Sequence, residues 1–146
     1  MKIVFVVVGK AKDRALRELL DDYAARIKRY AKVEEVELGD GDEAGVAARI
    51  AKRVPERASL VALEVDGQRL GSEALARFVE RCEVGSVPAI VFVVGGSYGL
   101  PKSTSASADL RLSLSDMTLP HRLARLVLYE QVYRAFTILR NEPYSH

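Results

Sequence analysis

The stretch VPAIVFVVGGSYG, residues 87–99, joins the most apolar run of the chain directly to its tightest glycine cluster. Residues 87–94 are apolar on both faces, which is typical of a strand buried inside a parallel sheet. The glycines of 95–99 follow at once and allow the backbone to approach a ligand closely. Because open α/β sheets bind ligands at the carboxyl ends of their strands, the stretch predicts both an α/β fold and a binding turn.

Similar apolar runs predict further strands over residues 2–8, 33–38, 59–65 and 110–114. Segments with helical periodicity alternate with them, which is typical of a mainly parallel sheet, here of five to six strands, flanked by helices. We expect one domain over residues 1–146. The helices are predicted as a stripe from Leu16 to Tyr30, a segment after Asp42 that includes Val54, a segment capped by Ser72, and a last helix from Pro120 to about Leu139.

The composition is 49% hydrophobic and 29% charged, which favours a soluble globular protein over a disordered one. The apolar start at residues 3–8 lacks a cleavage site, and no run is long enough for a membrane span. The one cysteine, Cys82, falls in a core stripe and is predicted to be an inert buried thiol. A cytoplasmic protein without membrane association is therefore expected.

The net charge of +2 is unevenly distributed along the chain. Residues 1–32 carry nine Lys and Arg against four Asp and Glu, whereas 33–83 carry seven against twelve. The last segment, 121–146, has four basic and two acidic residues. Basic ends permit binding of a polyanion, although solvated helix faces would produce the same pattern.

Two nucleotide-binding motifs can be compared with the glycine turn, and neither fits. Residues 96–103 match the phosphate-loop pattern except at its second glycine, where Pro101 offers no N–H to a phosphate. The dinucleotide fingerprint belongs after the first strand, but the turn there has only Gly9. A tight structural turn remains an alternative reading of residues 95–99.

Residues 112–121 form a second candidate binding loop, in which Met117 and Leu119 stand among small hydroxyl residues. Such a loop suits an aromatic ligand that needs apolar walls and backbone hydrogen bonds, and a buried crossover is the alternative. Metal chemistry has no support because the chain has two histidines and one cysteine. A hydrolase elbow is absent, which leaves His121, His146, Tyr144 or a carboxylate for proton transfer.

Several segments together resemble the SPOUT class of RNA methyltransferases, and within it the small family that methylates N3 of a pseudouridine in bacterial large-subunit ribosomal RNA. The resemblance extends over the whole chain, and the order and spacing of the segments make it specific. They are residues 2–4 with 8–10, 63–67, 94–100, 114–121, 128–135 and the tail 141–144.

The resemblance implies a SPOUT fold with a deep trefoil knot at the C-terminal end, where the last helix threads through a loop. It also implies that S-adenosylmethionine is the methyl donor, that no metal is needed, and that the backbone of the knot holds the donor. The family's cofactor pocket maps onto Leu63, Gly96, Ser115, Asp116, Met117, Thr118, Leu119 and Pro120.

The family acts as a homodimer that combines the cofactor pocket of one subunit with the C-terminal tail of the other. Tyr144 and Arg134 match residues that bind or orient RNA, and His121 is a further candidate for direct chemistry. The family's histidine directly follows the tail tyrosine, whereas here Ser145 intervenes before His146. We hypothesise that the base is His146 or a network of groups on the phosphate side of the RNA. The first and last helices are expected to supply the contacts to phosphate.

The expected substrate is an assembled ribosome, because a chain of this size has no separate RNA-binding domain. Two other function classes stay open. One is a different nucleotide-binding α/β enzyme that uses residues 95–99, and titration with S-adenosylmethionine, ATP and NAD would separate it. The other is a knotted dimer that binds ribosomes or RNA without catalysis.

Overall fold

The computed structural model describes residues 1–144 and contains one sheet of five parallel strands in the order β2-β1-β4-β3-β5. The strands are β1 (Lys2–Val8), β2 (Lys32–Leu38), β3 (Ser59–Arg69), β4 (Ala89–Val94) and β5 (Leu110–Ser113). The helices are α1 (Arg14–Ile27), α2 (Glu43–Ala51), α3 (Ser72–Val84), α4 (Lys102–Ser107) and α5 (His121–Leu139). The predicted α/β class and the parallel sheet are confirmed.

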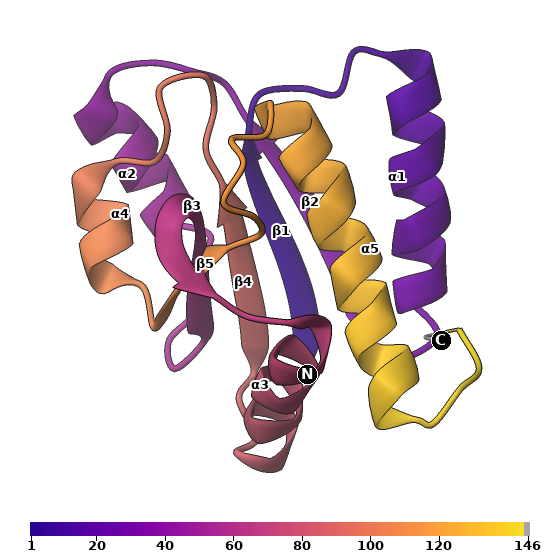
Figure 1. The fold of residues 1–146 in the computed structure, drawn as a ribbon. Helices are drawn as coiled ribbons and strands as arrows, with labels where there is room; N and C mark the ends of the chain where they lie inside the picture. The colour runs from indigo at the N-terminus through magenta and orange to yellow at the C-terminus, as the bar shows by residue number, and fades with distance from the viewer. Residues whose placement is uncertain (145–146) are drawn as a thin grey trace.

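The helices cover both faces of the sheet (Figure 1), and the central strands are consequently apolar on both sides. Ile3, Phe5 and Val7 of β1 pack with α1, α3 and α5. Val4, Val6 and Val8 alternate with them and pack against α2 on the opposite face, where α4 also lies. This alternation explains why a run of valines at the N-terminus forms an interior strand of the sheet.

Helix α5 packs across the sheet between α1 and α3, and it carries the buried polar cluster of the fold. The Tyr129 ring stacks on Phe5 with centroids 3.9 Å apart, and its hydroxyl donates to Glu35 on β2 at 2.6 Å. Arg125 is only 2% exposed and donates to Glu37 at 2.6 Å and to Glu35 at 3.2 Å. These contacts fix the rotation and height of α5 against β2.

Four details differ from the sequence-based predictions. Helix α2 ends at Ala51, before Val54, because Arg53 and Val54 close tighter turns onto Ile50 and Ala51. Ser72 is the first residue of α3 and not its cap, and its hydroxyl donates to Gln131 of α5. Helix α4 was not predicted, and β3 continues four residues beyond the predicted end at Val65.

The longer β3 results from an irregularity in its pairing with β5. Leu63 and Gln68 both lie opposite Leu112, so residues 64–67 arch out of the ladder. At Gly67 an added Cβ would lie 2.7 Å from the carbonyl oxygen of Arg111, which only glycine permits. The arch raises Glu64, Val65 and Asp66 above the carboxyl edge of the sheet.

Cys82 lies on α3 and is buried in the hydrophobic core, as predicted, and burial raises the pKa of its thiol. No helix within residues 1–144 is long and apolar enough to cross a membrane.

Candidate functional site

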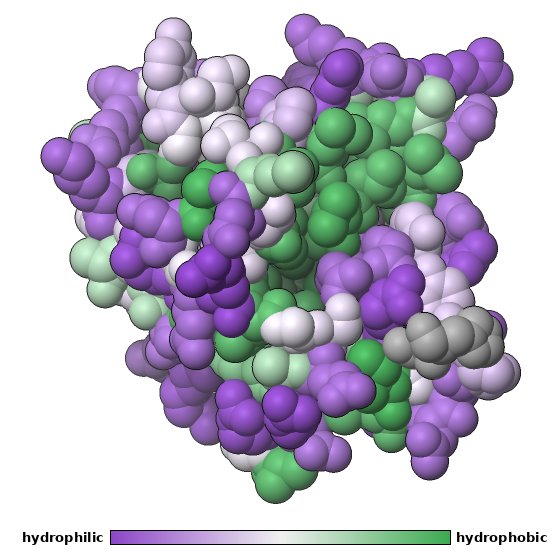
Figure 2. Space-filling model, viewed as in Figure 1, coloured by the Kyte–Doolittle hydropathy of each residue, from purple (hydrophilic) through white to green (hydrophobic). Residues whose placement is uncertain are grey.

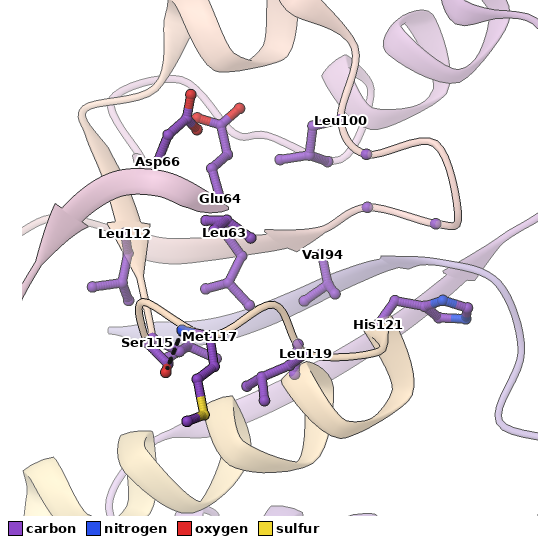
Figure 3. A pocket seen from close by; sticks show the side chains of 16 residues that line it. Leu63, Glu64, Asp66, Val94, Leu100, Leu112, Ser115, Met117, Leu119 and His121 are labelled. Atoms are coloured by element: carbon purple, nitrogen blue, oxygen red, sulfur yellow. Dashed lines mark hydrogen bonds between the residues drawn. The ribbon is translucent and has the colours of Figure 1, made fainter.

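A pocket of about 360 Å³ lies at the carboxyl ends of β3, β4 and β5, against the loop that leads into α5. In Figure 3 the side chains of Leu63, Val94 and Leu119 gather around one cavity. Their apolar walls and the adjoining glycine backbone suit a flat ligand with polar edges. The lining residues are Leu63, Glu64, Val65, Asp66, Val94, Gly95, Gly96, Gly99, Leu100, Leu112, Leu114, Ser115, Met117, Leu119, His121 and Ala124.

The glycine turn forms one wall of this pocket, and its geometry excludes larger residues. Gly96 and Gly99 form an isolated bridge, and Gly99 has a φ of +79°, which favours glycine. At Gly95 an added Cβ would lie 2.6 Å from the carbonyl carbon of Gly99. The turn is therefore built for a close approach of backbone to backbone, which also leaves main-chain groups exposed beside the cavity.

The arch of β3 forms a second, acidic wall. The Glu64 carboxylate accepts hydrogen bonds from Ser105 of α4 and Arg111 of β5, and its side chain is mostly buried. Asp66 pairs with the same Arg111 at 3.3 Å and is largely exposed. Sequence reasoning missed both carboxylates, because the arch depends on the pairing between β3 and β5.

The loop between β5 and α5 forms the third wall and holds itself in place through hydroxyl groups. Ser113 donates to the Ser115 carbonyl at 3.0 Å, and the Met117 amide donates to the Ser115 hydroxyl at 2.9 Å. Met117 lines the pocket although it is 76% exposed, which places apolar surface at the mouth of the cavity. Asp116 turns outward and pairs with Arg69 at 2.6 Å.

Five of the eight residues predicted for the cofactor line the pocket: Leu63, Gly96, Ser115, Met117 and Leu119. Asp116, Thr118 and Pro120 belong to the same loop but are exposed and do not line it. His121 lies at the pocket margin, with its ring pointing away from Val94 toward the chain after β1 (Figure 3).

The phosphate-loop alternative finds no support in this geometry. Lys102 is the first residue of α4, and its backbone N–H donates to the carboxylate of Glu43 at 3.1 Å. A carboxylate of the protein thus accepts the hydrogen bond from the amide that a phosphate would need.

Residues 1–144 contain no group of three or more His, Cys, Asp or Glu side chains placed to hold a metal ion.

Tyr144 and Arg134 lie together, but at the far end of α5. The Tyr144 hydroxyl donates to Glu130 at 2.7 Å, and Arg134 donates to the same carboxylate at 2.7 Å. The Arg134 guanidinium also lies over the Tyr144 ring, 4.9 Å from its centroid. The ring meets Tyr133 edge-on, with centroids 4.6 Å apart. We call Glu130, Tyr133, Arg134 and Tyr144 the tail cluster; His146 lies outside the described residues.

Contacts within the tail cluster shift the pKa values of Tyr144 and Glu130 in opposite directions. Partial burial and the hydrogen bond to Glu130 raise the pKa of Tyr144 above its ordinary value of 10.0. Partial burial acts to raise the pKa of Glu130, but hydrogen bonds from Arg134 and Tyr144 outweigh it and lower that pKa. At neutral pH Tyr144 is therefore a hydrogen-bond donor and Glu130 a carboxylate.

The pocket and the tail cluster of one chain are well separated. His121 and Arg134 are thirteen residues apart on α5, which places them roughly 20 Å apart at about 1.5 Å per residue. Within one chain, therefore, the tail cluster does not complete the pocket.

The family model described as "Predicted SPOUT methyltransferase" matches residues 1–146. A protein of Sorangium cellulosum named "Ribosomal RNA large subunit methyltransferase H" is 50% identical over 146 residues, covering 100% of both chains. A protein of the same name from Geobacter metallireducens is 42% identical over 100% of this chain and 99% of its own.

Among solved structures, one described as a probable methylase family protein from Haemophilus influenzae superposes with a TM-score of 0.58 at 12% identity. The match covers 99% of this chain and 70% of that one, and it supports the fold alone. The full-length sequence matches carry the assignment further. This chain belongs to the SPOUT methyltransferase family.

Proposed function

We propose that the chain methylates large-subunit ribosomal RNA, with S-adenosylmethionine as methyl donor and N3 of a pseudouridine as acceptor. The observation that carries the proposal is the pocket at the carboxyl edge of the sheet, found in a SPOUT methyltransferase whose full-length relatives are named for ribosomal RNA. No observation favours the other nucleotide-binding enzyme or the non-catalytic dimer over this activity.

The residues of the pocket fit this donor. A volume of about 360 Å³ lies in the range of small-molecule sites, roughly 300–1,000 Å³. Leu63, Leu119 and Met117 offer apolar surface to an adenine ring, and the glycine turn offers backbone hydrogen bonds. Glu64 and Asp66 add negative charge, which suits a ligand with a positive sulfonium group.

When bound, the donor supplies an electrophilic methyl carbon, and the S–CH₃ bond breaks as the bond from the ring nitrogen forms. The protein aligns donor and acceptor and excludes water. A base must also take the N3 proton, and the raised pKa of Tyr144 makes that residue a donor instead. We assign the role of the base to His146 or to a network of groups on the phosphate side of the RNA, and His121 is a second candidate for this role. Tyr144 positions the pseudouridine ring, and Arg134 orients the RNA.

We further propose that the active site forms between two copies of the chain. The separation of the tail cluster from its own pocket supports this proposal, because the tail of a second copy could reach the pocket that its own chain leaves incomplete. Figure 2 shows apolar surface over the first half of α5 and the adjoining face of α1, which such a partner would cover. Its exposed members include Leu19, Leu123 and Val127. The trefoil knot, the single domain, the assembled ribosome as substrate and the cytoplasmic location stay predictions.

Gly95→Ala should weaken donor binding strongly and abolish methylation. The added Cβ meets the Gly99 backbone at 2.6 Å, so the turn must open and the pocket wall is lost. We expect the Kd for S-adenosylmethionine, measured by calorimetry, to rise at least about tenfold. Labelled methyl incorporation into ribosomes should fall to background.

Gly39→Ala is the matched control, because an added Cβ there meets nothing within 4 Å. It should bind donor and methylate ribosomes as the wild type does. Retention of donor affinity by Gly95→Ala would contradict the assignment of the pocket. Tighter binding of ATP or NAD than of S-adenosylmethionine by the wild type would contradict the choice of donor.

A further inference from the structure

The β1–α1 loop carries two exposed lysines near the pocket, and two hydrogen bonds from its backbone amides anchor this loop to β2. Gly9 has a φ of +114° and donates its N–H to the Leu38 carbonyl at 2.8 Å. Two residues on, the Ala11 N–H donates to the Glu37 carboxylate at 3.0 Å. Lys10 and Lys12 flank this anchored residue, and both are exposed.

The same carboxylate ties the loop to α5. Glu37 accepts from the buried Arg125 at 2.6 Å as well as from Ala11, so one side chain bridges the loop and the second turn of the helix. At the other end of the loop, the site of an added Cβ on Gly9 lies 3.8 Å from Nε2 of His121, which lines the pocket. The loop thus runs directly beside the pocket margin, above the start of α5 (Figure 1).

The cations on the β1–α1 loop and at the start of α5 differ from those of α1, which we expected to contact phosphate. On α1, Arg17 pairs with Asp21, Glu35 and Glu37, and Arg26 pairs with Asp22. Within residues 1–144, Lys10, Lys12 and Arg122 form no ion pair. Three charges, on the β1–α1 loop and at the first turn of α5, are therefore available to an anion.

The opposite margin of the pocket repels such a ligand. Glu64 and Asp66 line the pocket there, partly neutralised by Arg111. An RNA strand that delivers a base to the pocket therefore meets a more favourable potential from the side of the β1–α1 loop than from the side of Glu64 and Asp66. Figure 2 shows hydrophilic surface over this loop and the start of α1, next to the apolar face.

We infer that Lys10, Lys12 and Arg122 form an RNA clamp that binds the phosphates flanking the target nucleotide, with Glu37 and Arg125 as positioning residues. The clamp rests on the proposed function, and it places the phosphate contacts on the loop before α1 and at the first turn of α5. Because phosphate contacts position a nucleic acid without reading its sequence, the clamp governs affinity and leaves the choice of base to the pocket.

The test is the double variant Lys10→Ala/Lys12→Ala, measured for binding to large ribosomal subunits over a series of salt concentrations. Loss of two phosphate contacts should weaken binding about tenfold at low salt and reduce the slope of log affinity against log salt by about 1.5. The affinity for S-adenosylmethionine should stay unchanged. Arg122→Ala should reduce the slope by about half as much.

The matched control is Lys52→Ala/Arg53→Ala, which removes two exposed cations after α2, at the opposite edge of the sheet. It should bind the subunits as the wild type does. A double lysine variant with the affinity and slope of this control would overturn the clamp, even with methylation intact. Absence of methylation by the wild-type protein would instead contradict the proposed function, so the two fail separately.

Discussion

Tyr144→Ala should methylate ribosomes at about a hundredth of the wild-type rate, because a misplaced acceptor costs roughly 10²-fold, and it should bind donor normally. The side chain lies in the tail cluster, where it packs on Tyr133 and under Arg134, far from its own pocket. Its removal therefore leaves the pocket intact and disrupts only what the tail brings to a partner. Methyl incorporation and donor calorimetry measure the two effects.

The same variant allows a test of the shared active site. Gly95→Ala has an intact tail and Tyr144→Ala an intact pocket, so a mixed dimer contains one complete site. In an equal mixture about a quarter of all sites should be complete if the dimers are symmetric and exchange freely. Mixing the two variants, each of which has little or no activity by itself, should thus restore about a quarter of the wild-type activity.

The control mixture combines Tyr144→Ala with the double variant Gly95→Ala/Tyr144→Ala, which offers no intact tail, and it should stay inactive. Mass measurement of the intact complexes establishes that mixed dimers form. Mixed dimers without recovery of activity would contradict a site shared between subunits. Wild-type activity of Tyr144→Ala by itself would contradict any role of the tail.

Arg125→Met should destabilise the protein by about 3 kcal/mol, the lower end of the cost of breaking a buried ion pair. The methionine keeps much of the apolar stem but leaves Glu37 and Glu35 with Arg17 alone as a cationic partner. The lower end applies because both carboxylates keep about a quarter of their side-chain surface exposed, at 25% and 27%. Urea unfolding at a fixed protein concentration measures the change.

The effect of Arg125→Met should depend on pH. Partial burial acts to raise the pKa of Glu37, but hydrogen bonds from Arg125 and from the Ala11 amide outweigh it and lower that pKa below its ordinary 4.5. A carboxyl with a depressed folded pKa stabilises the protein above its unfolded pKa, and this contribution is lost as pH falls through the folded pKa. The difference between wild type and variant should therefore be full near pH 7 and shrink below about pH 4.

Arg140→Met is the control for Arg125→Met. Arg140 pairs with Glu83 at 3.3 Å on the surface, with 43% of its side chain exposed. Such a pair contributes at most about 1 kcal/mol. Equal destabilisation by the two variants would show that the buried cluster of α5 has no special role in holding the helix.

The sequence predicted the five strands because their short apolar runs are local signals, which are strongest in the Val and Ile of β1 and β4. It missed the extension of β3, since the arch depends on Gly67 approaching Arg111 of another strand. It also missed α4, a short run of Ser, Thr and Ala without an apolar stripe. Local composition thus identifies the strands, whereas pairing partners set their ends.

The sequence likewise predicted only part of the candidate site. The glycine turn and the loop of residues 115–119 carry their own signals, and both border the pocket. Glu64 and Asp66 reach it only through the arch, and Arg125 meets Glu37 across 88 positions of sequence. The distance between the tail cluster and the pocket also follows from the length of α5 and not from any motif. Contacts of this kind appear only when the chain is folded.

The proposed methylation is tested most directly by mass spectrometry of large-subunit RNA, after ribosomes that lack the modification are incubated with the protein and S-adenosylmethionine. We expect one added methyl group, on N3 of a single pseudouridine, and none with Gly95→Ala. A methyl group on another atom or nucleotide, or RNA of unchanged mass, would contradict this proposal.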